Sequence, residues 1–211
     1  MYADSASVLL DSIQAPDELT DKDFAHWCML CGKVTDEAAT GLLPIYQWQR
    51  AQQWFTEHGT AEEQAQIDLY LGRAYVEDGE YDKAMQIYAD ALQLAKEHQA
   101  YNVAGYICAY MADLYGFRDI TSECLKKREE ACEFFKKAEN YKSYAYSLKD
   151  LAGEWAILDS FACTIPLLQK ADSISQLLHN KNLTAAIANA FALIYEMQGK
   201  YNEAETAYLK A

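Results

Sequence analysis

The sequence has little proline and no long apolar run, and each shortage excludes a class of protein. Only 3 of the 211 residues are proline and 51% are hydrophobic, so the chain can bury a core and is not disordered. Because no stretch of about 18 apolar residues occurs, no transmembrane helix is expected. Residues 1–5 lack the basic and apolar regions of a signal peptide, so the compartment is either the cytoplasm or one addressed by a segment preceding this chain.

Basic residues are also scarce. The chain has 18 Lys and Arg against 32 Asp and Glu, which gives a formal net charge of −14. An acidic surface repels phosphate groups, so nucleic acid and anionic lipid are disfavoured as partners of this segment, and no direct membrane insertion is expected. An RNA-binding helical repeat is the weakest interpretation for the same reason.

Alternating Val, Ile and Thr are scarce too, while Ala and Tyr are abundant, which favours an all-α protein. The chain repeats every forty residues, with units starting near 25, 65, 105, 145 and 185. The eighth place of each unit is small, and the eleventh is aromatic in four units. The twenty-seventh place is always alanine, at Ala51, Ala91, Ala131, Ala171 and Ala211.

The pattern of each unit predicts two helices. In residues 65–98, Leu71, Ala74 and Tyr75 share one helical stripe, and Asp78-Gly79 then interrupts the helix. Ala84, Tyr88 and Ala91 share the stripe of the following helix. Small residues in facing places allow two helix backbones to approach closely, and the tyrosines fill the remaining space.

These residues resemble the tetratricopeptide repeat (TPR) family. The pattern is carried by Leu71-Gly72, Tyr75, Gly79, Tyr81, Ala84, Tyr88 and Ala91, and again by Phe191, Tyr195, Gly199, Tyr201, Ala204 and Tyr208. The resemblance implies a right-handed α-solenoid of antiparallel helix pairs. The usual repeat has about 34 residues, so six extra residues lengthen either the helices or the loops. HEAT-type repeats reach 40 residues but do not explain the Leu-Gly, Tyr and Gly-x-Tyr pattern.

Cys28 and Cys31 have the spacing of a redox motif, but their surroundings predict packing. A thioredoxin-like site needs a strand before the cysteines and a helix that starts at them. The preceding segment, residues 17–26, is charged and better suited to starting a helix capped by Thr20. No second Cys pair of this spacing supplies the four ligands of a structural zinc site. We therefore expect both cysteines on the inward stripe of a helix.

The TPR resemblance implies a binding surface on the concave face, which is lined by the first helix of each pair. Family members contact ligands through the second, fifth, sixth, ninth, twelfth and thirteenth places of each unit. Carried over, these places predict partner contacts at Gln66, Leu69, Tyr70, Arg73, Tyr106, Tyr110, Asp113, Phe117, Tyr146, Lys149 and Asn189. The same places include His26, Glu77, Asp150, Leu193 and Met197. The competing interpretation is that the tyrosines only pad one first helix against the next.

No enzyme, metal site or cofactor is predicted, because the four histidines are spread along the chain and Gly32-Lys33 lacks a phosphate-binding loop. Some TPR proteins clamp a peptide carboxylate with a Lys and an Asn. Lys149 stands in a suitable place, but Gly153 occupies the place of the asparagine. Binding of chaperone tails is therefore unsupported.

The two ends of the chain differ. Residues 1–16 predict a lone capping helix that buries Val8, Leu9, Leu10 and Ile13 and ends at Pro16. Residues 17–211 predict a superhelix of about five helix pairs whose last unit is truncated, since Ala211 stands at the twenty-seventh place. An uncapped repeat exposes apolar surface, which a second copy could cover as a homodimer.

The opening of the chain, residues 54–75 and the forty-residue period resemble TPR regions of Bacteroides-type envelope proteins, which implies the cell envelope or periplasm and the sensory part of a regulator. The leading functional hypothesis is a non-catalytic scaffold that binds a protein or peptide on its concave face. The alternatives are a sensor of a peptide or small ligand and a structural oligomerisation module.

Overall fold

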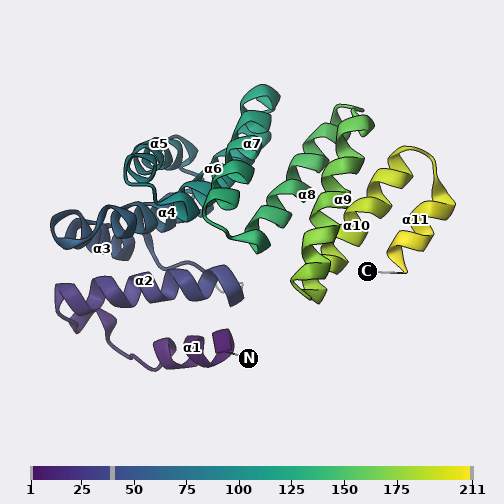
Figure 1. Ribbon diagram of the computed structural model, residues 1–211. Coiled ribbons are helices and arrows are strands. Elements are labelled where there is room, and N and C mark those ends of the chain that lie inside the picture. Colours follow the sequence, from purple (N-terminus) through teal and green to yellow (C-terminus); the bar gives the residue numbers. More distant parts are fainter. Residues whose placement is uncertain (1, 39–40, 210–211) are drawn as a thin grey trace. The chain divides into compact units, whose positions relative to one another are not determined.

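A computed structural model describes residues 2–38 and 41–209, and in these residues the chain is all helical (Figure 1). One short 3-10 helix, η1, and the following α-helices make up this part of the chain: α1 (Tyr2–Asp11), η1 (Pro16–Glu18), α2 (Asp21–Ala38), α3 (Ile45–His58), α4 (Ala61–Glu77), α5 (Tyr81–Glu97), α6 (Tyr101–Phe117), α7 (Thr121–Lys137), α8 (Tyr141–Ile157), α9 (Phe161–Leu177), α10 (Lys181–Met197) and α11 (Tyr201–Tyr208). The predicted all-α class is confirmed, and successive helices form the expected helix pairs.

The chain forms two compact units, Met1–Tyr110 and Met111–Ala211. The first unit contains α1 to α5 and the beginning of α6, and the second contains the end of α6 and α7 to α11. Within the first unit, α2 packs on α3, α3 on α4, and α4 on α5. Within the second, α7 packs on α8, α8 on α9, and α10 on both α8 and α9. The first helices α2, α4, α8 and α10 thus contact helices of their own pair and of a neighbouring pair.

The extra length of the repeat lies in the helices. From α4 to α10 every helix has 17 residues and begins twenty residues after the previous one. At a rise of 1.5 Å per residue each helix is about 26 Å long. Three residues connect one helix to the next. The forty-residue period is therefore two equal half-repeats of helix and turn.

The turns between residues 78 and 200 share one hydrogen-bonding pattern. The N–H of the third turn residue donates to the carbonyl oxygen five residues earlier, as from Glu80 to Tyr75 at 2.8 Å and from Asn180 to Ser175 at 3.2 Å. This bond closes a Schellman motif and requires the middle residue in the left-handed region. Glycine meets that need at Gly79 and Gly199, with φ of 78° and 71°. The other turns use Gln99, Asp119, Glu139, Asp159 and His179.

Glycines at the eighth place let aromatic rings lie against the helix backbone. A Cβ added to Gly72 would lie 2.2 Å from the buried ring of Tyr88, and one added to Gly32 would lie 2.4 Å from Tyr70. These separations are far below van der Waals contact, so no side chain fits at either place. The small residues of the repeat therefore serve the close packing predicted for them.

The N-terminal helix differs from its prediction. Helix α1 ends at Asp11, and Pro16 begins η1 instead of ending the first helix. Leu10 packs against the core of the first unit, but Val8 and Leu9 are each 69% exposed, and Ile13 is also exposed. The expectation that all four side chains point inward was wrong, because α1 is too short to lay more than a narrow stripe on α2.

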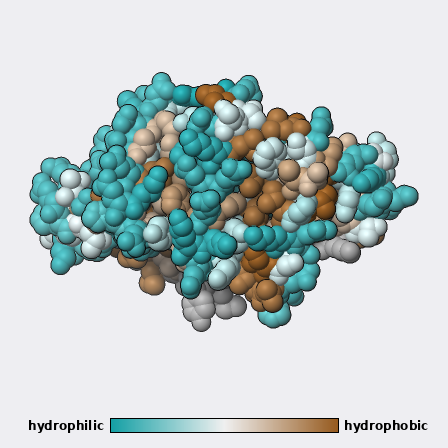
Figure 2. Space-filling model, turned by 45° about the horizontal axis from the view of Figure 1, so that its top comes forward, coloured by the Kyte–Doolittle hydropathy of each residue, from teal (hydrophilic) through white to brown (hydrophobic). Residues whose placement is uncertain are grey.

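Apolar side chains also reach the surface elsewhere, as the brown areas of Figure 2 show. In the second unit the largely exposed ones include Ile157, Leu193 and Met197. Within residues 2–38 and 41–209, no helix combines the length and the apolar character needed to cross a membrane.

Candidate partner-binding surfaces

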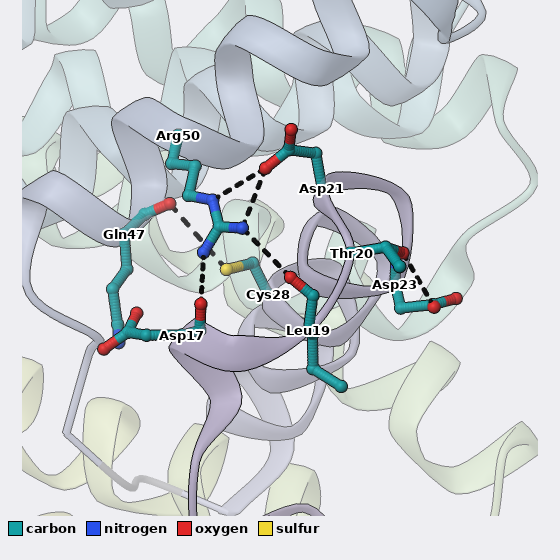
Figure 3. Close-up of polar contacts among 8 residues, drawn as sticks. All are labelled: Asp17, Leu19, Thr20, Asp21, Asp23, Cys28, Gln47 and Arg50. Carbon is teal, nitrogen blue, oxygen red and sulfur yellow. Dashed lines mark hydrogen bonds and ion pairs between the residues drawn. The ribbon is translucent and has the colours of Figure 1, made fainter.

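Cys28 and Cys31 lie in the middle of α2, so the helix does not start at them as it would in a redox site. Figure 3 shows Cys28 facing the carbonyl oxygen of Gln47. Cys28 is fully buried, and its Sγ lies 3.8 Å from the carbonyl oxygen of Gln47. Burial raises the pKa of the Cys28 thiol far above its usual value, which keeps it protonated and unreactive. Thr20 Oγ1 accepts the N–H of Asp23 at 3.2 Å, as the helix-start prediction requires.

Arg50 of α3 ties this region together, a role that the repeat pattern does not reveal (Figure 3). Its guanidinium donates to Asp21 Oδ1 at 2.7 and 3.0 Å and to the carbonyl oxygens of Asp17 and Leu19, both at 3.1 Å. The same group lies 4.1 Å from the centroid of the Phe24 ring. Arg50 therefore joins η1, α2 and α3, and its contacts are structural.

Two of the predicted contact residues lie in the core of the first unit. Leu69 is 1% exposed and Tyr70 is 0% exposed. Tyr70 packs against Trp48 and fills the space over Gly32, and its hydroxyl donates to Asp36 Oδ2 at 2.9 Å. Their prediction as partner contacts was wrong, because Leu69 is buried and the close approach of α2 and α4 encloses Tyr70.

The remaining predicted residues of the first unit are half-buried and are already engaged within it. Arg73 forms an ion pair with Asp36 of α2, and its guanidinium lies 5.1 Å from the ring centroid of Tyr110 on α6. Tyr110 in turn stacks on Tyr88, with 6.2 Å between ring centroids. Gln66 and Tyr106 are also only partly exposed. In this unit Arg73 links three first helices, which favours the padding interpretation.

The predicted residues of the second unit are more varied. Asp113 accepts from Arg128 at 2.6 Å, and burial raises the pKa of the Asp113 carboxyl despite this pairing. Phe117 and Asn189 are exposed, whereas Tyr146 and Lys149 are half-buried. These residues are not all brought together. Lys149 lines a cavity, as do Asp150, Leu193 and Met197 of the wider set.

That cavity is a groove of about 340 Å³ lined mainly by the first helices α8 and α10, with Arg128 of α7 and Leu168 of α9. Its apolar side is formed by Ile157, Leu193 and Met197, which are 72%, 54% and 51% exposed. The last two belong to the wider set of carried-over places, and Asn189 lies one helical turn before Leu193. A stripe of exposed apolar side chains along a groove is the usual form of a peptide-binding surface.

Gly153 keeps the groove open. The ninth place of the units holds Lys33, Arg73, Asp113, Gly153 and Leu193. In the second forty-residue repeat the long side chain of Arg73 stands at this place and reaches α2 on one side and α6 on the other. A Cβ added to Gly153 would meet no atom within 4 Å. The fourth repeat therefore leaves empty the space that Arg73 fills in the second.

The other side of the groove is charged and internally paired. Lys149 Nζ lies 2.6 Å from Asp150 Oδ1, and Arg128 Nε lies 3.6 Å from Glu154 Oε1. The Arg128 Nε–H group is buried and has no hydrogen-bond acceptor among the described residues. A buried donor without an acceptor is costly. The groove thus places two paired charges beside an apolar stripe.

In the described part of the chain, no three His, Cys, Asp or Glu side chains gather as they would around a metal ion. The predicted absence of a metal site and of catalytic residues stays a prediction.

Comparisons with known proteins identify the repeat. The tetratricopeptide repeat family model TPR_10 matches residues 69–98 and 184–211. Among curated proteins, none matches this sequence.

Several solved structures resemble the chain in fold. BtubC (BKLC) from P. vanneervenii aligns with a TM-score of 0.72 and 16% identity, over 97% of this chain and 86% of that one. A Podosopora anserina kinesin light chain structure with nearly identical TPR-like repeats aligns with a TM-score of 0.63 and 15% identity, over 94% of this chain and 95% of that one. Aspartyl phosphate phosphatase F from Bacillus subtilis aligns with a TM-score of 0.67 and 11% identity, over 91% of this chain and 60% of that one. At such low identity these likenesses show the fold alone. Two stretches of the chain therefore match the tetratricopeptide repeat family, and the chain has the fold of TPR-like helical repeat proteins.

Proposed function

We propose that this chain is a non-catalytic scaffold that binds a peptide segment of a partner protein in the groove between α8 and α10. The observation that carries the proposal is the row of exposed apolar side chains, Ile157, Leu193 and Met197, in the groove that Gly153 also lines. The TPR fold supports a protein partner, since these repeats generally serve as interaction scaffolds.

The chemistry of the groove defines the peptide. Its apolar stripe favours a segment that presents two or three apolar side chains along one edge. Lys149 and Arg128 are each paired with a carboxylate, so the groove has no strong preference for an acidic or a basic peptide.

The test is to close the groove without disturbing the fold. Gly153→Leu places an apolar side chain in the open space, where a Cβ meets no atom within 4 Å. Peptides selected on the parent chain from a phage-displayed random library should bind this variant about tenfold or more weakly. The matched control is Ala162→Leu, which adds the same side chain to an exposed face of α9 outside the groove.

The proposal fails if the selected peptides bind Gly153→Leu as tightly as the parent, or if the selection yields no specific peptide. Thermal unfolding serves as the folding check. We expect Gly153→Leu to be at least as stable as the parent, because leucine has a higher helix propensity than glycine by about 0.5–1 kcal/mol.

A further inference from the structure

A second cavity lies in the Met111–Ala211 unit, apart from the groove between α8 and α10. It measures about 550 Å³ and is enclosed by α9, α10 and α11. Its walls share no residue with the groove. Pockets of roughly 300–1,000 Å³ are the usual size of small-molecule sites. The cavity is therefore large enough for a small molecule.

Along this cavity the fifth repeat has smaller residues than the fourth repeat has at the same places. Thr184 and Ala188 line it from α10. Forty residues earlier the same places hold Tyr144 and Leu148, which are both buried. The larger pair is packed into the fold of the preceding repeat, whereas the smaller pair borders an open cavity. The side chains of the fifth repeat thus contribute to the space of the cavity.

The lining joins aromatic rings to carboxylates. Phe191 and Tyr195 stack along one wall, with 6.1 Å between ring centroids and an interplanar angle of 22°. Asp172 of α9 and Glu203 of α11 contribute a carboxylate each. Gln176 Nε2 donates to Asp172 Oδ2 at 2.8 Å, which orients that carboxylate.

No Lys, Arg or His is among the described residues that line the cavity, so its formal charge is negative. The faces of aromatic rings carry negative electrostatic potential and attract cations. Carboxylates beside such rings strengthen that attraction, most of all where water is partly excluded. An anion would meet repulsion from both carboxylates, and a neutral apolar molecule would gain nothing from them.

We propose that the cavity between α9, α10 and α11 binds a small organic cation, an amine or guanidinium attached to an apolar body. The cationic group lies near Asp172 and Glu203, and the apolar body lies against Phe191 and Tyr195. The cation has two sources with the same chemistry, a free amine or the side chain of an arginine in a peptide. This site is independent of the peptide groove.

The experiment measures binding of phenethylammonium, with 2-phenylethanol as the neutral compound of the same shape. Titrations followed by NMR on the full chain give both dissociation constants. Phenethylammonium should bind with a dissociation constant of about 1 mM or lower, in keeping with the affinity that so few atoms provide. The alcohol should bind at least about threefold more weakly, because it lacks the interaction with rings and carboxylates.

Ala188→Leu restores the residue of the preceding repeat and fills the cavity, so binding of phenethylammonium should be lost. The substitution has a precedent in the folded chain, since Leu148 is buried at the equivalent place. Glu203→Gln should weaken binding about threefold or more by removing one charge. Glu205→Gln, also exposed on α11 but outside the lining, is the matched control and should leave binding unchanged.

Equal affinity for the alcohol and the ammonium, or full binding by Ala188→Leu, would overturn the proposal. The capped tripeptide acetyl-Gly-Arg-Gly-amide separates the two sources. Tighter binding of the tripeptide than of phenethylammonium indicates a peptide side chain, and the reverse order indicates a free amine. In both cases the binding must be lost in Ala188→Leu for the cavity to be the site.

Discussion

At the scale of single residues, the stability of this chain depends on a few side chains enclosed between helices. Asp68 of α4 is the clearest polar case. Its carboxylate accepts from Gln52 Nε2 of α3 at 2.6 Å. Burial raises the pKa of the Asp68 carboxyl from 3.8 to about 6, an effect that Gln52 opposes and the Asp90 carboxylate reinforces. At neutral pH the Asp68 carboxyl is still mostly charged in the folded state, and that buried charge lowers the stability of the fold.

Asp68→Asn is expected to stabilise the chain at neutral pH. A raised pKa means that protonated Asp68 favours folding below about pH 3.8, and that this contribution is lost as the pH rises through about 6. Asparagine keeps the oxygen that accepts from Gln52 and stays neutral. At pH 8 the variant should gain up to about 3 kcal/mol in the free energy of unfolding, at about 1.4 kcal/mol per pKa unit.

Urea unfolding at pH 8 and pH 5 measures this gain, which should shrink at the lower pH. Glu77→Gln, a substitution at an exposed position of the same helix, is the control. A pH-independent difference between Asp68→Asn and the parent would contradict the prediction.

Two helical glycines should respond in opposite ways to alanine. Gly72→Ala places a Cβ 2.2 Å from the buried Tyr88 ring, so it should lower the free energy of unfolding by about 1–3 kcal/mol through overpacking. Gly153→Ala meets no atom within 4 Å and should raise it by about 0.5–1 kcal/mol through helix propensity. Denaturant unfolding of both variants is the measurement, and a shared sign would refute the packing argument.

At the scale of elements, the regularity of the chain comes from one turn used repeatedly. Between α4 and α11 each turn ends one helix with a residue in the left-handed region and starts the next helix three residues later. The repeated bond from the third turn residue to the carbonyl five residues earlier sets the angle between helices in the same way each time. The twenty-residue half-repeat follows from this uniform turn and the uniform helix length.

The turns themselves are open to test. A Cβ added at Gly79 meets no atom within 4 Å, so Gly79→Ala acts through the backbone alone. It should lower the free energy of unfolding by about 1 kcal/mol, because the left-handed conformation is unfavourable for a residue other than glycine. Glu139→Gly makes the reverse change at the equivalent place, where φ is 55°, and should stabilise or leave the chain unchanged. Thermal unfolding of the two variants compares them, and a loss of stability in Glu139→Gly would contradict this account.

At the scale of the whole molecule, both candidate sites lie where one repeat departs from its neighbours. Gly153 replaces the longer residues that other units have at the ninth place and opens the groove between α8 and α10. Thr184 and Ala188 replace Tyr144 and Leu148 and open the cavity among α9, α10 and α11. Repeats that follow the pattern bury their side chains against one another, so departures from it are the places available for ligands. The net charge of −14 adds a general preference for cationic ligands.

The sequence by itself determined the helices, the turns and the repeat. The small residues at the eighth place, the breaks at Gly79 and Gly199 and the forty-residue period depend on local conformation and spacing, which a single sequence records. The packing role of Cys28 followed from its helical register. By contrast, only the tertiary structure decided which first-helix residues reach the surface. Tyr70 and Lys149 belong to the same carried-over set, yet Tyr70 is enclosed over Gly32 whereas Lys149 lines a groove. Exposure depends on the side chains of helices forty residues away, and spacing along one helix carries no information about them.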